Sequence, residues 1–171
     1  SPTMMIHRRL KYAAKQNREI VSGKITNTKG GDEILEDVFH LSIIGDIVLS
    51  NGYRIEALTN LSEIEFAGSS AQTIPADAFV DSKIYALIIN NSAGVNLGGS
   101  RTVSGELELT NGILTVGANT LTIGGTVTRT SGVIDASNSG SLIEFTNTSG
   151  LTLPASVFSG NVGNLKMNGT G

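Results

Sequence analysis

The chain has little of what usually closes the core of a compact enzyme. It contains no cysteine and no tryptophan, only three prolines, and aromatic residues make up 5% of its 171 positions. The lack of cysteine excludes disulfides and thiolate metal sites, and it fits an oxidising exterior and the cytosol equally well. With so few aromatic rings, small aliphatic side chains must fill the interior, as they do in a stack of repeated turns.

Long apolar runs are also missing. No segment approaches the roughly 18 apolar residues that a membrane-spanning helix needs, so we expect no transmembrane segment. Residues 1–9 lack the apolar stretch of a signal peptide, although a mature secreted chain could begin in this way. The absence says little about location.

Charge is divided unevenly along the sequence. Residues 1–30 carry a net charge of +6, and residues 31–171 carry −9. A basic arm can bind nucleic acid or membrane. No aromatic stacking residues accompany these lysines and arginines, so we expect a solvated or self-docked helix and no nucleic-acid partner.

The main positive feature is an internal repeat. Ile64–Phe79 and Ile143–Phe158 are 79 positions apart and share 8 of 16 residues. After a one-residue deletion, Leu87–Asn90 matches Leu165–Asn168. Self-similarity at a long period is typical of units that stack on copies of themselves. We expect a piece of a longer repetitive protein.

The apolar pattern divides the chain into four parts. Residues 4–20 carry a narrow apolar stripe at helical spacing, so residues 1–23 are predicted to form a basic helix that caps one end of the stack. Residues 24–63 are predicted to form the first, irregular turns. Residues 64–142 are the first full repeat unit, and residues 143–171 begin a second, truncated one.

From residue 82 onward, apolar and polar residues alternate in runs of about four, separated by glycine and asparagine turns. This alternation predicts short strands with one buried face. A β-sandwich would favour longer strands and more aromatic residues. We therefore predict an all-β fold, a right-handed parallel β-helix (β-solenoid) with three short strands and about 20 residues per turn, hence about four turns in the 79-residue unit.

Several segments together resemble a known group of proteins. They are Ala71–Ala76, Leu87–Leu97, Leu107–Leu121 and Arg129–Ser137. Their order and spacing are similar to the long repeats of large surface and secreted adhesin-like proteins of the Bacteroidetes, many of them type IX secretion cargo. The resemblance covers about residues 62–171. It implies an extracellular, adhesive or spacer role and supplies no catalytic residues.

One pair of carboxylates could serve catalysis. Glu106 and Glu108 are two positions apart on one predicted strand, which places their carboxylates about 7 Å apart on the same face. Glycosidases use pairs at comparable separations. No other acid converges on this pair, so a solvated strand face is the better interpretation, and we predict no catalytic residues.

Candidate metal ligands are equally weak. Asp32, Glu33, Glu36 and Asp37 could supply oxygen ligands for calcium, but their spacing matches neither an EF-hand nor a calcium-binding nonapeptide. The two histidines, His7 and His40, have no second ligand at metal spacing. We predict no metal site and no cofactor.

Threonine pairs raise the alternative of ice binding. Thr120/Thr122 and Thr126/Thr128 are six positions apart, whereas a ladder of threonines needs a spacing of about 20. We therefore expect the two pairs to lie on different faces and to be ordinary polar strand residues.

These patterns lead to three hypotheses for function. The first is a non-enzymatic structural or adhesive segment of a bacterial cell-surface or secreted protein, which contacts glycans or surfaces through its polar face and stacks on neighbouring repeats. The second is a phage or virion tail fibre attached through the basic helix. The third is a polysaccharide-cleaving β-helix enzyme.

Overall fold

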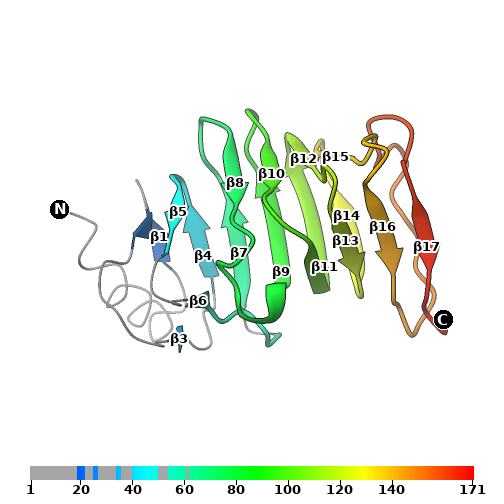
Figure 1. The fold of residues 1–171 in the computed structure, drawn as a ribbon, viewed down its shortest axis with the longest axis horizontal. Coiled ribbons are helices and arrows are strands. Elements are labelled where there is room, and N and C mark those ends of the chain that lie inside the picture. The colour runs from blue at the N-terminus through cyan, green and yellow to red at the C-terminus, as the bar shows by residue number, and fades with distance from the viewer. Residues whose placement is uncertain (1–18, 22–24, 27–33, 36–39, 50–53, 61) are drawn as a thin grey trace.

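The computed structural model describes residues 19–21, 25–26, 34–35, 40–49, 54–60 and 62–171. In this part of the chain every pair of neighbouring strands runs parallel. The strands stand side by side along the long axis of the molecule, from β1 at one end to β17 at the other (Figure 1). The predicted parallel β-solenoid is confirmed, with about six turns, and the alternative of a β-sandwich with antiparallel pairs is wrong.

The strands are short and numerous. They are β1 (Glu19–Val21), β2 (Ile25–Thr26), β3 (Ile34–Leu35), β4 (His40–Ile43), β5 (Ile47–Val48), β6 (Arg54–Ile55), β7 (Glu63–Phe66), β8 (Gln72–Ile74), β9 (Lys83–Asn90), β10 (Val95–Leu97), β11 (Arg101–Asn111), β12 (Ile113–Thr115), β13 (Thr120–Ile123), β14 (Thr126–Arg129), β15 (Val133–Asp135), β16 (Leu142–Phe145) and β17 (Leu165–Met167). A 3-10 turn, Val80–Ser82, precedes β9, and the described residues contain no α-helix.

The largest sheet, called sheet A here, holds the order β1-β4-β7-β9-β11-β13-β16-β17, with β14 also paired to β11. A second sheet has the order β15-β12-β10-β8, and β2-β5 and β3-β6 form two smaller ones. From β7 to β16, the strands that begin the two copies of the repeat, sheet A takes four steps. The 79-residue unit therefore spans four turns, as the sequence predicts.

The two copies of the repeat also agree residue by residue. Ile64 pairs with Leu87, and Ile143 pairs with Leu165 in the same register. An isolated bridge between Ile55 and Phe79 recurs, 79 positions later, between Ile134 and Phe158. The sequence repeat is thus a structural repeat.

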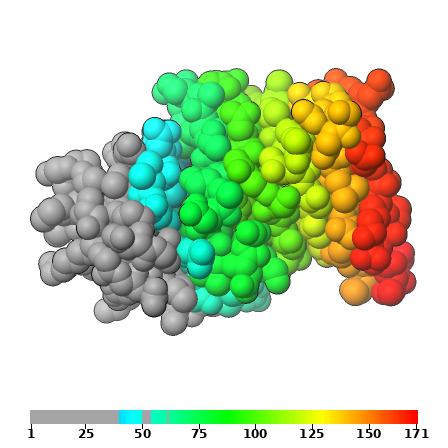
Figure 2. Space-filling view, in the orientation of Figure 1, coloured from blue at the N-terminus to red at the C-terminus, as the bar shows by residue number. Residues whose placement is uncertain are grey.

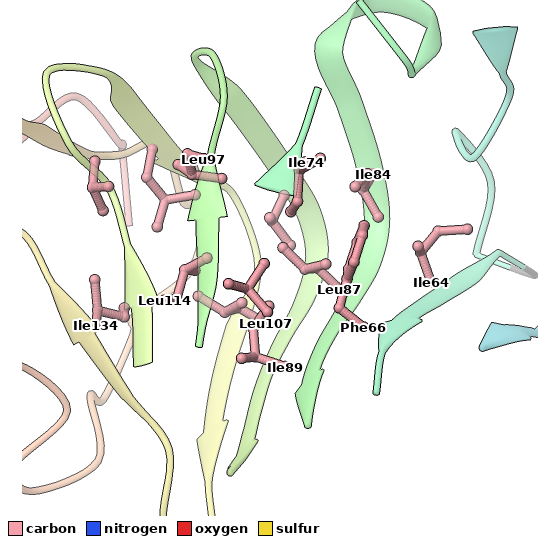
Figure 3. Close-up of a cluster of buried hydrophobic side chains, with 14 of the residues drawn as sticks. Ile64, Phe66, Ile74, Ile84, Leu87, Ile89, Leu97, Leu107, Leu114 and Ile134 are labelled. Atoms are coloured by element: carbon pink, nitrogen blue, oxygen red, sulfur yellow. The ribbon is translucent and has the colours of Figure 1, made fainter. Parts of the chain in front are cut away.

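The core is a column of aliphatic side chains between the sheets. Leu41, Ile64, Leu87, Leu107 and Val127 follow one another in register on successive strands of sheet A. All are at most 5% exposed. Figure 3 shows such side chains pointing from both sheets into the same interior. Because each turn covers the apolar residues of the one before, burial of this column stabilises the stack at about 25 cal/mol per Å².

Strand β11 is much longer than the predicted strands of about four residues. Its first part pairs with β13 and its second part with β14, and its register with β9 shifts between Val103 and Glu106. The chain can continue through this corner because Gly105 and Gly125 have no side chain. A Cβ on Gly105 would meet the ring of Tyr85, and one on Gly125 would meet the carbonyl oxygen of Gly105. Close contacts between adjacent turns therefore allow β11 to be so long. The spacing of apolar residues in the sequence does not reveal such contacts.

Buried amides join three successive turns. Gln72 donates from Nε2 to the carbonyl oxygens of Ile43 and Gly45, at 3.0 and 2.8 Å. Its Oε1 accepts from Asn91 Nδ2 at 2.9 Å. Asn91 is fully buried, and its amide also donates to the Ser70 carbonyl oxygen. Because each polar atom has a partner, this cluster avoids the cost of burying unpaired amides.

The prediction of a capping helix is wrong where the structure tests it. Glu19 and Ile20, at the end of the predicted helix of residues 4–20, belong to strand β1 and pair with β4. A parallel neighbour offers the β-branched Ile20 and Val21 a ladder of backbone bonds, which overrides the local helical pattern. Residues 1–18 and 22–24, the rest of the predicted cap at residues 1–23, lie outside the described residues. The described part of the chain has no helix long and apolar enough to cross a membrane.

Candidate functional site

The outward positions of sheet A form rows that run across several turns. Inward and outward positions alternate along each strand, and parallel pairing aligns outward positions into rows. One row is His40, Glu63, Ala86, Glu106 and Thr126. The next row, two positions along the strands, is Ser42, Glu65, Ile88, Glu108 and Thr128. We call these two rows the carboxylate rows, because each holds two glutamates.

The structure places Glu106 and Glu108 as the sequence predicts, on one strand and on its outer face. Glu106 Oε1 accepts from Thr128 Oγ1 at 2.9 Å, across to the next turn. Glu108 Oε1 accepts from Thr110 Oγ1 at 2.9 Å, on its own strand. The two carboxylates thus have similar surroundings, each with one threonine hydroxyl.

Charged groups also pair between turns. His40 Nδ1 lies 2.9 Å from Glu63 Oε2, and Lys166 Nζ lies 2.9 Å from Glu144 Oε1. The hydrogen bond from Lys166 holds the pKa of Glu144 below its ordinary value. Partners on neighbouring strands are set about 4.8 Å apart by the backbone, so such pairs link turns without a dedicated site.

Both threonine pairs lie on strands of sheet A. β13 carries Thr120 and Thr122, β14 carries Thr126 and Thr128, and both strands pair with β11 in sheet A. The two strands pair with different parts of β11, before and after its register shift, so the prediction that the pairs lie on different faces stays a prediction. Along its row Thr122 follows Thr102, and the next strand has Glu144 at this place. Threonine therefore spans only two turns in this row.

A second polar row, on the smaller four-stranded sheet, is not among the sequence predictions. It consists of Thr73, Asn96, Thr115 and Asp135, aligned in register on β8, β10, β12 and β15. Asp135 Oδ1 accepts from the hydroxyl and the backbone N–H of Ser137, at 2.7 and 3.0 Å. These bonds, the hydroxyl's above all, lower the pKa of Asp135. The signal in the sequence is a spacing of 19 to 23 positions, which a search for neighbouring motifs overlooks.

Metal ligands do not gather in the described residues. No group of three or more His, Asp or Glu side chains there could hold a metal ion. His40 lies on β4 beside Glu63, with its side chain 18% exposed. His7, Asp32, Glu33, Glu36 and Asp37 lie outside the described residues.

One cation is buried inside the stack, and the sequence analysis missed it. Arg101 is 2% exposed, at an inward position that Leu121 occupies on the next turn. Its Nη2 donates to the Pro75 carbonyl oxygen at 2.7 Å, and its guanidinium lies 5.4 Å from the centre of the Phe79 ring. Burial lowers the pKa of Arg101 to about 10, partly opposed by the charge of Asp77.

Comparison with known proteins adds no relative. No protein-family model matches this sequence, no curated protein matches it, and no solved structure matches the fold.

Proposed function

We propose that this chain is a non-enzymatic structural and adhesive segment of a large bacterial cell-surface or secreted protein, built as a right-handed β-solenoid. The handedness follows the strong preference of parallel crossover connections for the right hand. The adhesin-like resemblance of residues 62–171 supports the class of protein and the extracellular location.

The observation that carries this proposal is the continuous parallel pairing of the strands of sheet A from β1 to β17. Continuous backbone pairing makes a stiff spacer, because each turn bonds to its neighbours along the whole sheet. Parallel pairing also aligns the outward polar side chains of successive turns, as in the carboxylate rows, so that they recur once per turn. Many weak, equally spaced contacts suit multivalent binding to glycans or surfaces.

Adhesion can be tested by displaying the chain at high density on beads and measuring retention on immobilised neutral glycans. The comparison is a variant with Thr73→Ala, Asn96→Ala and Thr115→Ala, which removes three groups of the second polar row without touching the core. We expect the parent beads to be retained more strongly than the variant beads. Failure of the parent beads to be retained on any of the glycans would sink the adhesive part of the proposal.

The second candidate is a polysaccharide-cleaving enzyme, favoured by the carboxylate pair on β11. Here Glu106→Gln and Glu108→Gln would each abolish cleavage of acidic glycans while leaving the melting temperature near that of the parent. We expect the parent itself to release no reducing ends, which would exclude this candidate for the substrates used.

The third candidate is a phage or virion fibre. This hypothesis requires the predicted attachment helix, but the last residues of that helix, Glu19 and Ile20, belong to strand β1. The oligomeric state measured by sedimentation distinguishes this candidate from our proposal. A fibre is expected to be a trimer, whereas a segment of a surface protein is expected to be a monomer.

A further inference from the structure

One end of the solenoid exposes side chains that belong to core rows. β17 is the last strand in the order of sheet A, and in the described part of the chain its only partner is β16. Leu165 and Met167 follow the buried Ile143 and Phe145 in register, yet they are 52% and 71% exposed. Figures 1 and 2 show β17 and its flanking segments forming this end of the body.

The internal repeat shows what such a surface looks like when it is covered. Leu87 and Ile89, the equivalents of Leu165 and Met167, are both fully buried. They have the same partners on one side, since Ile64 and Phe66 pair with them as Ile143 and Phe145 pair with Leu165 and Met167. The difference lies on the other side, where β11 covers β9.

The same contrast holds around the rest of the turn. We define the end face as Leu153, Phe158, Val162, Leu165 and Met167. Their equivalents in the first copy are Ile74, Phe79, Ile84, Leu87 and Ile89, all at most 1% exposed. Leu153, Phe158 and Val162 are only partly buried. All five positions are thus buried in the first copy of the repeat and more exposed in the second.

The covering turn in the first copy has a definite pattern. Leu97 pairs with Ile74, Val103 with Ile84, Leu107 with Leu87 and Leu109 with Ile89. Arg101 lies over the ring of Phe79. The required partner is therefore an extended segment with aliphatic residues at the places of Leu97, Val103, Leu107 and Leu109, and an arginine at the place of Arg101.

We propose that the end face is a docking surface for one further turn of this chain's own type, with the sequence pattern of residues 94–111, which pairs in parallel with β17. It binds by adding a strand to an open sheet edge and by covering the end face. Its arginine stacks on Phe158 as Arg101 does on Phe79. The proposal rests on the exposure of the end face and on its comparison with the first copy of the repeat, and it does not depend on an adhesive role.

The test appends a copy of residues 94–111 directly after Gly171, which keeps the spacing of the first copy. The matched control carries the same segment with aspartate at the places of Leu107 and Leu109. The readout is the rate at which hydrogen peroxide oxidises Met167, followed by mass spectrometry of the peptide that contains it, because exposed thioethers oxidise faster than buried ones.

We expect the appended turn to slow oxidation of Met167 several-fold and to raise the melting temperature, while the aspartate control does neither. Equal oxidation of Met167 in both fusions, with circular dichroism showing both folded, would overturn the proposal. So would a parent chain that sediments as a dimer with Met167 already protected, because the occupant would then be a second copy packed end to end. Neither outcome bears on glycan retention, which tests the proposed function separately.

Discussion

The guanidinium of Arg101 lies over the ring of Phe79, 5.4 Å from its centre, inside the aliphatic column of the solenoid. Nε and Nη1 have no hydrogen-bond partner among the described residues. A buried cation so poorly paired is a cost to the folded state, which burial of the aliphatic rows offsets.

Replacing this cation should therefore not weaken the fold. Burial lowers the pKa of Arg101 to about 10, and this shift corresponds to a cost of roughly 3 kcal/mol below pH 10. Loss of the bond to Pro75 removes part of the gain, so we expect Arg101→Met to be neutral or to stabilise by about 1–2 kcal/mol in urea unfolding at pH 7. A loss above about 2 kcal/mol would contradict this account. Because the folded-state pKa of Arg101 lies below the unfolded-state pKa, the cost in the parent falls as pH rises above about 10 towards the unfolded-state pKa. The advantage of the variant should shrink over that range.

The aliphatic column should be sensitive to polarity at its centre and tolerant at its open end. Leu107 is fully buried and Leu165 is 52% exposed, both at inward positions. Leu107→Asn should cost about 3–5 kcal/mol or prevent folding, since it leaves a cavity and an unpaired amide. Leu165→Asn should cost less than about 1 kcal/mol. Equal melting temperatures for the parent and Leu107→Asn would show that this side chain does not face a core, and Leu121 and Ile143 should behave like Leu107.

The corner of sheet A should reject even one methyl group. Gly125→Ala places a Cβ against the carbonyl oxygen of Gly105, where backbone meets backbone and neither can rotate away. We expect a loss of about 2 kcal/mol or more in thermal or urea unfolding. Gly160→Ala is the control, because nothing lies within 4 Å of its Cβ position, and its effect should stay within about 0.5 kcal/mol. If the two variants have the same melting temperature, the backbones at Gly105 and Gly125 are not closely packed in solution.

The amide cluster should hold three turns together. Asn91→Ala removes bonds to Ser70, Gln72 and Ala93, which should cost about 2–4 kcal/mol because buried partners are left unsatisfied. Asn96→Ala on the adjacent strand β10 changes an exposed residue and should alter stability by less than about 0.5 kcal/mol. Hydrogen exchange at residues 68–72 should also speed up in the first variant alone. Unchanged hydrogen exchange at residues 68–72 in Asn91→Ala would show that the Asn91 side chain does not hold the neighbouring turn in place.

The ion pair on the last two strands of sheet A should set the pKa of Glu144. Lys166→Met removes the main cause of the lowered pKa of Glu144, so that pKa should rise toward its ordinary value in an NMR titration, with the bond from Asn168 Nδ2 remaining. Because the folded-state pKa is depressed, the small stabilisation is present above the unfolded pKa of the carboxyl and is lost as pH falls through the folded one. A pKa of Glu144 that does not change in Lys166→Met would mean that the two side chains do not pair in solution.

Alternation and the repeat, both local properties of the chain, determined much of this protein in advance. Leu107 and Leu121 could be placed inward because polar residues flank each of them. The match of Leu87 with Leu165 could be found because equivalent turns need the same side chains. About 20 residues per turn follows from three short strands per turn, and the pairing of Ile64 with Leu87 and of Ile143 with Leu165 agrees with it.

Contacts between turns decided the rest, and the contacts named below join residues 20 to 26 positions apart. Ile20 and Val21 form a strand because β4 offers them a parallel neighbour. β11 continues through its corner because glycine lies under the ring of Tyr85. Arg101 enters the core because Phe79 and the Pro75 carbonyl receive it. Local sequence reports which face of a strand is apolar, whereas only the assembled stack specifies what each residue meets on the turn above and below.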